Sequence, residues 1–279
     1  MRRSCVVASL MVLALGATAL ARAIAPPAIT QRLAVADIVV MGRVNGVEDM
    51  DIEAILVPGT TKQMARVAQV TVTEILQGPK DLKDIRVAFP AKPAGGVKSY
   101  PTVDLQTGRE YLLLLRKDKD GKLYICQTLS DALERAAGNA NFDKELTQVK
   151  RCLKLLADPT AALKSKDSEE RLLTATLLIQ KYRLNNTGMD KQEPIDAELS
   201  KQILTVLKDT EDWGKFDQLT RTTPQILFQQ LGLQKDDGWM PPQPVTGDYQ
   251  KTYTTAARAW LAENVGKYRI KRFIPTENK

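Results

Sequence analysis

The chain has 279 residues, a formal net charge of +7 and no histidine. Histidine is the usual general base beside serine and cysteine nucleophiles and the commonest zinc ligand, so its absence argues against most hydrolase mechanisms. Basic residues are interleaved with acidic ones along the chain, a pattern that does not favour nucleic-acid or membrane-surface binding.

Residues 1–23 have the pattern of an export signal. Arg2 and Arg3 precede an uncharged apolar run over 5–21, and Ala21-Arg22-Ala23 is the small-x-small pattern of a signal-peptidase site. We expect cleavage after this site, which leaves a net charge of +4, and a periplasmic or extracellular location. The alternative is an uncleaved membrane anchor, because the run of 17 residues is just shorter than the roughly 20 that span a bilayer.

The segments before residue 130 that are rich in Val, Ile, Leu and Tyr predict β-strands, because turn residues bound each of them. They are residues 35–44, 67–76, 84–89, 109–118 and 122–127, with a further short strand expected at 51–57. Asp118-Lys119-Asp120-Gly121 predicts a tight hairpin turn between the last two. Five or six strands within about 100 residues are typical of a small closed barrel or a sandwich.

Four stretches of this region, ADIVVMGRV, VAQVTVTEILQGP, DIRVAFP and GREYLLLLRKD, carry a resemblance to a known module. Together they resemble the netrin-like OB-fold module, whose best-known members are the tissue inhibitors of metalloproteinases. The resemblance covers residues 30–128 and implies an exported OB-like β-barrel domain suited to contacting another macromolecule. The matching positions are Ala36, Asp37, Gly42, Val44, Gly78, Gly108, Tyr111 and Leu112.

One departure from that family concerns the mature N-terminus. Metalloproteinase inhibitors of the family begin with a cysteine whose free amine and carbonyl bind the catalytic zinc. The mature chain here would begin at Ile24-Ala25-Pro26-Pro27 and has no cysteine at that position. The resemblance therefore does not imply metalloproteinase inhibition by that route.

After residue 130 the spacing of apolar residues changes to three and four, which predicts helices. The predicted helical segments are 130–138, 142–157, 168–183, 196–209, 223–233 and 254–265. Residues 158–183 resemble one HEAT-like helical pair, with an apolar face that includes Leu172 and Ile179 and packs on Leu155. We expect an α+β protein: an OB-like barrel followed by a separate α-helical domain over 129–279, ending in an edge strand near YRIKRFIP.

Export leaves two cysteines in the mature chain, Cys126 and Cys152. An oxidising compartment favours a disulfide between them, and this bridge would close a loop of 27 residues, worth about 3 to 4 kcal/mol in the chain-entropy model. The alternative is that both are small buried apolar residues, because Cys126 ends a predicted strand while Cys152 lies on a predicted helix.

Few other residues suggest a site. Trp213, Trp239 and Trp260 could form an exposed platform for a sugar or peptide, although such residues more often lock helices onto a core. Alternating carboxylates at Asp49, Asp51 and Glu53 could hold calcium, but a solvated acidic edge is the simpler interpretation. The sequon that begins at Asn185 matters only in a eukaryotic secretory route.

Two functions from different classes fit these observations. The first is an exported, non-enzymatic protein-interaction module whose partner is a protein such as a protease or an envelope component. The alternative is a carbohydrate-binding or carboxylate-dependent glycan-cleaving protein, which requires a cleft with two close carboxylates and aromatic platforms. The sequence indicates no catalytic residue, cofactor or metal, and we expect membrane contact only if the N-terminal segment is uncleaved.

Overall fold

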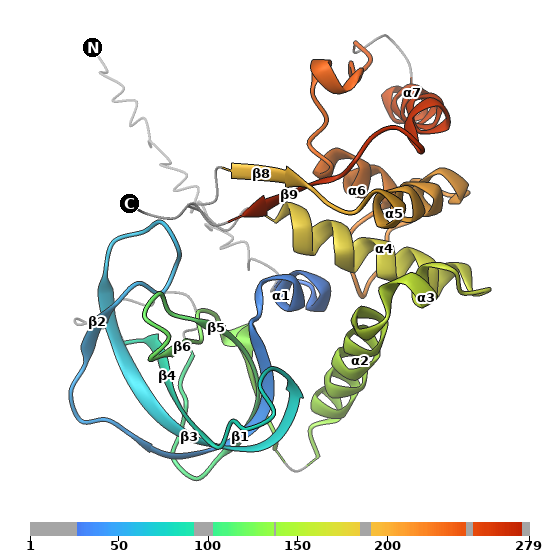
Figure 1. The fold of residues 1–279 in the computed structure, drawn as a ribbon. Helices are drawn as coiled ribbons and strands as arrows, with labels where there is room; N and C mark the ends of the chain where they lie inside the picture. Colours follow the sequence, from blue (N-terminus) through green and yellow to red (C-terminus); the bar gives the residue numbers. More distant parts are fainter. Residues whose placement is uncertain (1–26, 92–102, 137, 185–190, 244–247, 275–279) are drawn as a thin grey trace, which may run out of the picture.

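The computed structural model describes residues 27–91, 103–136, 138–184, 191–243 and 248–274. The protein is a mixed α+β structure in which most strands come first in the chain and most helices follow (Figure 1). The predicted signal peptide and the sequon at Asn185 lie outside the described residues. Within the described ranges, no helix is long and apolar enough to cross a membrane.

The strands predicted before residue 130 are confirmed, with different bounds. The strands of the main sheet are β1 (Ile38–Val47), β2 (Ile52–Ala54), β3 (Gln63–Gln77), β4 (Asp84–Pro90), β5 (Glu110–Lys117), β6 (Tyr124–Ile125) and β7 (Ala132–Glu134). The hairpin turn between β5 and β6 is also confirmed, since the Asp118 carboxylate accepts a hydrogen bond from the Leu123 amide at 2.9 Å.

The strand pairings follow a path that returns to its start. β1 pairs with β3, β3 with β4, β4 with β6, β6 with β5, and β5 with β1. The β4–β6 pair is parallel, and the others in this cycle are antiparallel. β2 extends one edge by pairing with β3, and β7 pairs with β5.

The first half of β1 and most of β5 are buried on both faces, which explains their nearly continuous apolar runs. One face contributes Val40 and Leu113 to an aliphatic core shared by the paired strands. The other face contributes Val39 and Leu112 to a second cluster, which also contains residues of α1, α2 and α4. The helices therefore lie directly on the outer face of these two strands, and one apolar cluster joins the two parts of the chain.

Gly42 is required in β1 because the backbone of β3 runs very close to it. A Cβ atom at this position would lie 2.5 Å from Val70 Cγ1 and 3.3 Å from the carbonyl oxygen of Thr71. The Val70 side chain is buried and the Thr71 oxygen belongs to the β3 backbone, so a Cβ atom here would force the side chain or the strand to shift. Gly42, one of the positions of the family resemblance, therefore has a local structural role.

The helix predicted at residues 130–138 is wrong. The chain forms a single 3₁₀ turn at Leu129–Asp131 and then enters strand β7, so the sheet continues past the boundary expected at 128. The Asp131 carboxylate accepts hydrogen bonds from the Thr128 amide and hydroxyl at 2.7 and 2.9 Å and closes the turn. Ladder bonds with the exposed edge of β5 then outweigh the helical propensity of a short alanine-rich segment.

The remaining predicted helices are confirmed in type. They are α2 (Ala140–Ala157), α3 (Pro159–Leu163), α4 (Ser168–Arg183), α5 (Ala197–Asp209), α6 (Pro224–Gln230) and α7 (Tyr249–Asn264). One further helix, α1 (Ile29–Val35), was not predicted. Side-chain caps fix several starts: the Asn139, Asp167, Asp196 and Asp248 side chains each accept hydrogen bonds from amides of the first turn.

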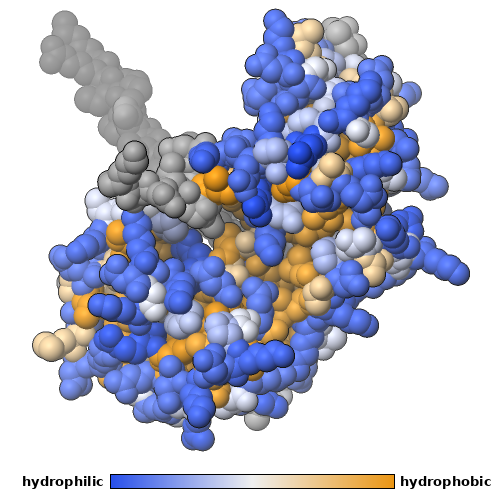
Figure 2. All heavy atoms as spheres, viewed as in Figure 1, coloured by the Kyte–Doolittle hydropathy of each residue, from blue (hydrophilic) through white to orange (hydrophobic). Residues whose placement is uncertain are grey.

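Helix α4 is the centre of the helical part. Every residue from Leu173 to Gln180 is buried, so the helix has no solvent-exposed face along this stretch. It packs against α1, α2, α3, α5, α6 and β9. Figure 2 shows apolar surface in the middle of this face of the molecule, where α1 lies in Figure 1.

The chain ends its described part in a strand, as YRIKRFIP predicts. β9 (Lys271–Ile274) pairs antiparallel with β8 (Lys191–Pro194) in a separate two-stranded sheet. The Arg183 guanidinium at the end of α4 connects this sheet to α6, because it donates hydrogen bonds to the carbonyl oxygens of Gln230 at 3.1 Å and Lys271 at 2.9 Å.

Candidate functional site

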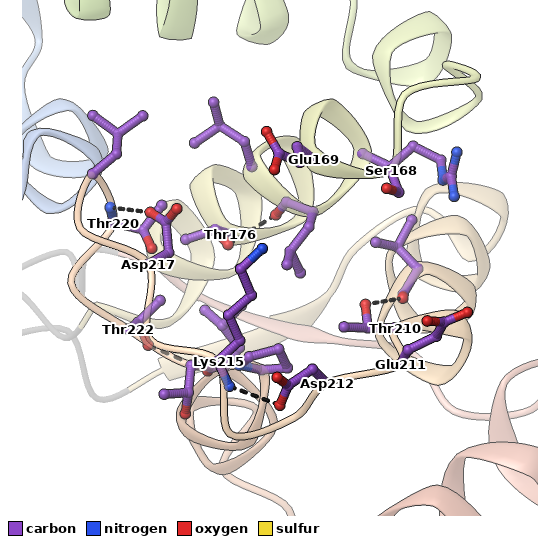
Figure 3. Close-up of a pocket in the computed structure, with 18 of the residues that line it drawn as sticks. Ser168, Glu169, Thr176, Thr210, Glu211, Asp212, Lys215, Asp217, Thr220 and Thr222 are labelled. Atoms are coloured by element: carbon purple, nitrogen blue, oxygen red, sulfur yellow. Dashed lines mark hydrogen bonds between the residues drawn. The ribbon is translucent and has the colours of Figure 1, made fainter.

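A pocket of about 420 Å³ lies among the helices (Figure 3). The N-terminal half of α4, the end of α5, the connecting segment 210–223 and the start of α6 form its walls. Arg151 of α2 also lines it, so residues from three separate stretches of sequence meet at one cavity. Pockets of this size between helices are a common location for ligand sites.

The two helix starts at the pocket are fixed by side-chain caps. At α4, one Asp167 carboxylate oxygen accepts hydrogen bonds from the Glu169 amide at 2.8 Å and the Glu170 amide at 3.4 Å. At α6, the Thr223 hydroxyl oxygen accepts a hydrogen bond from the Ile226 amide at 3.2 Å, and Pro224 occupies the first helical position. These caps fix the first turns of α4 and α6, and residues of both turns line the pocket.

Two aspartates shape the connecting segment 210–223. The Asp212 carboxylate accepts hydrogen bonds from the Gly214 and Lys215 amides, each at 3.0 Å. The Asp217 carboxylate accepts one from the Thr220 amide at 2.7 Å, and the Asp217 amide donates to the Thr222 carbonyl oxygen at 3.0 Å. The segment therefore has a defined path although it contains neither helix nor strand.

The pocket combines an apolar floor with a charged rim. Leu172, Val206 and Leu227 contribute to the floor, and Leu227 is 1% exposed. The charged residues of the lining are the acids Glu169, Asp209, Glu211, Asp212 and Asp217 and the bases Arg151, Arg171 and Lys215. In Figure 3 the Lys215 side chain extends from the connecting segment across the pocket towards α4.

Further features of the lining concern the kinds of ligand that the pocket could hold. No aromatic ring lines the cavity, and the described residues contain no cluster of three or more His, Cys, Asp or Glu side chains that could hold a metal ion. The Arg171 guanidinium donates hydrogen bonds to the Ser165 and Lys166 carbonyl oxygens at 2.8 and 3.2 Å. An apolar floor with a few fixed polar groups can hold a chain segment that carries both kinds of side chain.

The three tryptophans do not form an exposed platform. Trp213, Trp239 and Trp260 are 2%, 8% and 5% exposed, and all three belong to the core of the helical part. Their rings surround Phe228, with centroid separations of 5.7, 4.9 and 5.7 Å. The ligand-contact interpretation of these residues is wrong, because the rings pack on one another instead of facing solvent.

The acidic run near residue 50 also lacks the geometry of a metal site. Asp49 and Asp51 lie outside the short strand β2, and Glu53 lies within it, so the three carboxylates do not share one strand face. All three residues are exposed. The solvated acidic edge is the interpretation that this arrangement supports.

Cys126 and Cys152 are separate free thiols in the structure. Cys126 lies in the aliphatic core of the paired strands, whereas Cys152 belongs to α2 and lies in the cluster on the outer face of these strands. Burial raises the pKa of both thiols, to about 11 for Cys152, and the Asp131 carboxylate adds to the effect at Cys126. The arrangement corresponds to the alternative of two small buried residues.

Sequence reasoning did not identify Glu169, Glu211 or Lys215 as site residues. They are far apart in the chain, and a charge in a helical first turn or a loop is usually only solvated. One signal was present in the sequence. The stretch from Asp209 to Thr223 is long and polar but contains a tryptophan, which indicates a loop whose aromatic ring packs into a core.

No protein-family model matches the sequence, and no curated protein matches it. Function is therefore inferred below from the residues and geometry of the protein itself.

Proposed function

We propose that the protein is an exported, non-enzymatic protein-interaction module, and that the pocket between α4, α5 and α6 holds a segment of its partner. The observation that carries this proposal is the pocket itself: an apolar floor of Leu172, Val206 and Leu227 under a rim of charged side chains. Such a lining matches a peptide segment, which offers apolar side chains, charges and backbone groups together.

The carbohydrate alternative has less support. Sugar sites use exposed aromatic rings as platforms, but the tryptophans are core residues and no aromatic ring lines the pocket. Two rim carboxylates, Asp212 and Asp217, accept backbone hydrogen bonds that hold their own loop. These contacts give the Asp212 and Asp217 carboxylates a structural role, which does not favour them as a catalytic pair for glycan cleavage.

We propose that the strand part is an OB-like β-barrel similar to the netrin-like module and that it serves as the rigid base of the helical part. The closed cycle of strand pairs and the parallel β4–β6 pair support an OB-like barrel. Positions of the family resemblance also have structural roles: Gly42 admits β3, and the Tyr111 hydroxyl accepts a hydrogen bond from the Gln106 amide at 3.1 Å.

We propose that the helical part, which begins at α2 after strand β7, is a domain that does not act independently of the barrel. The cluster shared by β1, β5, α1, α2 and α4 supports a fixed seating of one on the other. Export is proposed from residues 1–23, whose charge, apolar run and cleavage pattern support it. Such a protein would present its pocket in the periplasm or outside the cell.

A neutral steric block tests whether the pocket is the partner site. Ser168→Trp places a large uncharged side chain at an exposed position of the rim, and Ala259→Trp places the same side chain on the exposed face of α7 as the matched control. Residues 24–279 are immobilised, and bound proteins from the exported fraction of the source cells are quantified.

A partner that is retained by the wild type and the Ala259→Trp variant but lost from the Ser168→Trp variant supports the proposal. Unchanged melting temperatures establish that both variants are folded. Equal capture by the wild type and both variants would contradict the assignment of the pocket.

A further inference from the structure

We infer that the group held in the pocket is a tryptophan side chain of the partner. This inference rests on the proposed function, because it names the chemistry of the partner segment at the same cavity. Four observations carry it: the size of the cavity, its apolar floor, its buried threonine hydroxyls and the position of the Lys215 side chain.

The size of the cavity suits a large side chain. An apolar cavity of roughly 150 Å³ in a protein core is enough to bind a benzene ring. The pocket has about 420 Å³, so it can take a bicyclic indole ring together with the backbone that carries it. A single leucine or valine side chain would leave much of this space to water and would bury less of the apolar floor.

The floor of the pocket favours an uncharged ring. Leu173, Val206 and Leu227 line the cavity and are 6%, 7% and 1% exposed. A charged group on this surface would lose its hydration, whereas an aromatic ring is stabilised by the burial of its apolar area. The charged side chains of the lining, apart from that of Arg171, belong to exposed residues and therefore stay in contact with water at the rim.

Threonine hydroxyls give the cavity hydrogen-bond acceptors. Thr176 and Thr222 line it and are 1% and 3% exposed. The Thr176 hydroxyl donates its hydrogen to the Leu172 carbonyl oxygen at 2.8 Å, and the Thr222 hydroxyl donates to the next carbonyl oxygen, at 3.4 Å. A hydroxyl group has one hydrogen and two lone pairs, so both oxygens can still accept a hydrogen bond. The indole N–H group of tryptophan, which only donates, is the complementary group.

The Lys215 side chain places a cation beside the same space. It extends from the connecting segment across the cavity towards α4 (Figure 3), and its ammonium group makes no ion pair with any described residue. A lysine ammonium group is attracted to the face of an aromatic ring, and most strongly to that of tryptophan. Because Lys215 is exposed and belongs to a loop, its side chain can lie over a ring seated on the floor. One indole ring thus matches the apolar floor, the threonine oxygens and the ammonium group together.

The test uses three capped amino acids: N-acetyl-tryptophanamide, its 1-methylindole derivative, which lacks the N–H donor, and N-acetyl-leucinamide. Binding to residues 24–279 is followed by amide chemical shifts, which also locate the site. We expect saturable shifts at pocket residues with the tryptophan compound. Binding should be about fivefold weaker after methylation, because one hydrogen bond is lost, and about tenfold weaker for the leucine compound, which buries less apolar area.

Two matched threonine variants make the test specific. Thr176→Val keeps the shape of the side chain but removes its oxygen, so it should weaken binding of the tryptophan compound about fivefold and leave that of the methylated compound unchanged. Thr174→Val is the control on the same helix. The Thr174 hydroxyl also donates to a carbonyl oxygen one turn earlier, at 2.8 Å, and the residue is buried, but it does not line the pocket. This variant should bind like the wild type.

Two lysine variants test the cation. Lys215→Met keeps an apolar stem without the charge and should weaken binding of both indole compounds about threefold. Lys215→Arg keeps the charge and should bind them like the wild type. Unchanged binding by Lys215→Met would contradict the placement of the ammonium group over the ring.

Equal binding of the tryptophan compound and its methylated derivative would overturn the inference, as would equal or tighter binding of the leucine compound, or shifts that appear only outside the pocket. Equal losses in the Thr176→Val and Thr174→Val variants would also overturn it. The Ser168→Trp experiment stays independent, because a partner that is lost through the steric block while the tryptophan compound fails to bind leaves the pocket as the partner site with a different chemistry.

Discussion

The strand part and the helical part have cores of different chemistry. The interior of the paired strands is mainly aliphatic, and its residues are positioned by backbone ladders. The helical core instead surrounds Phe228, whose ring also lies 6.3 Å from that of Tyr253. The hydrogen bonds between paired strands fix the positions of many residues at once. Packing of aromatic rings fixes only a few side chains and allows irregular segments between them. The pocket lies beside such a segment.

The two parts also differ in the kind of hydrogen bond that connects their elements. In the helical part, buried side chains bond to the backbone of distant elements: Ile270 donates its amide to the Ser200 hydroxyl at 2.9 Å, and Trp260 donates its indole N–H to the Asp237 carbonyl oxygen at 3.1 Å. In the strands the corresponding bonds are mostly ladder bonds. The stability of the helical part should therefore depend on fewer individual residues.

Replacement of the central ring is the strongest test of this contrast. Phe228→Ala should lower the free energy of unfolding by about 3–5 kcal/mol, because it leaves a cavity that the surrounding rings cannot fill. Urea unfolding followed by tryptophan fluorescence measures the loss. Phe216→Ala, at a ring that is 50% exposed, serves as control and should change stability by less than about 0.5 kcal/mol. Similar losses in both variants would contradict the anchoring role of Phe228.

The matching test in the strand part adds one methyl group. Gly42→Ala should destabilise by about 1–3 kcal/mol, because the new Cβ would lie 2.5 Å from Val70 Cγ1. Gly46→Ala is the matched control on the same strand, where a Cβ would have no neighbour within 4 Å. Chemical denaturation of both variants measures the difference, and equal stabilities would show that β3 can move away from β1.

A smaller effect on stability is expected from the ion pair between Asp237 and Lys271 in the helical part. Burial acts to raise the pKa of Asp237, but hydrogen bonds from Lys271 at 2.9 Å and from the Gln234 amide at 3.0 Å lower it overall. A carboxylate with a lowered folded pKa contributes stability above its unfolded pKa, and this contribution is lost as the pH falls through the folded value. At pH 7, Asp237→Asn should cost about 1 kcal/mol, since Lys271 is partly exposed.

The difference between the Asp237→Asn variant and the wild type should disappear in acid. Thermal unfolding at a series of pH values measures it, and the two curves should converge below the unfolded pKa of about 3.8. A difference that persists unchanged to low pH would show that Asp237 acts through its shape and not through its charge.

The smallest effect is expected from reductant. Because Cys126 and Cys152 are free and buried, a reducing agent should leave the melting temperature of the refolded protein unchanged. A thiol reagent should label both cysteines in urea and neither in the native state. A clear drop in melting temperature on reduction would instead demonstrate a disulfide between Cys126 and Cys152.

Much of the fold could be predicted from sequence because local patterns and tertiary packing agree there. The strands with Val and Ile runs are an example, as is the start of α4 at its Asp167 cap. The segment after Thr128 was mispredicted because the unpaired edge of β5, which no local pattern reveals, captures Ala132–Glu134.

The site was much harder to predict than the fold. Its floor uses leucines that also fit an ordinary helix face, and its rim uses charges that an ordinary surface also carries. Glu169 and Glu211 become neighbours of one cavity only after α4 and α5 pack together. The tryptophans were conspicuous in the sequence, but their burial depends on ring contacts between α6, α7 and two loops.

The position of helix α1 in the chain bears on the order in which the protein folds during synthesis. It precedes every other described element, yet it packs on α4, roughly 140 residues later in the chain. A ribosome releases α1 long before it makes α4, so the contact between these two helices cannot help early folding. Until α4 has been made, α1 can pack only on the strands and on α2, and the contact with α4 completes its burial late in synthesis.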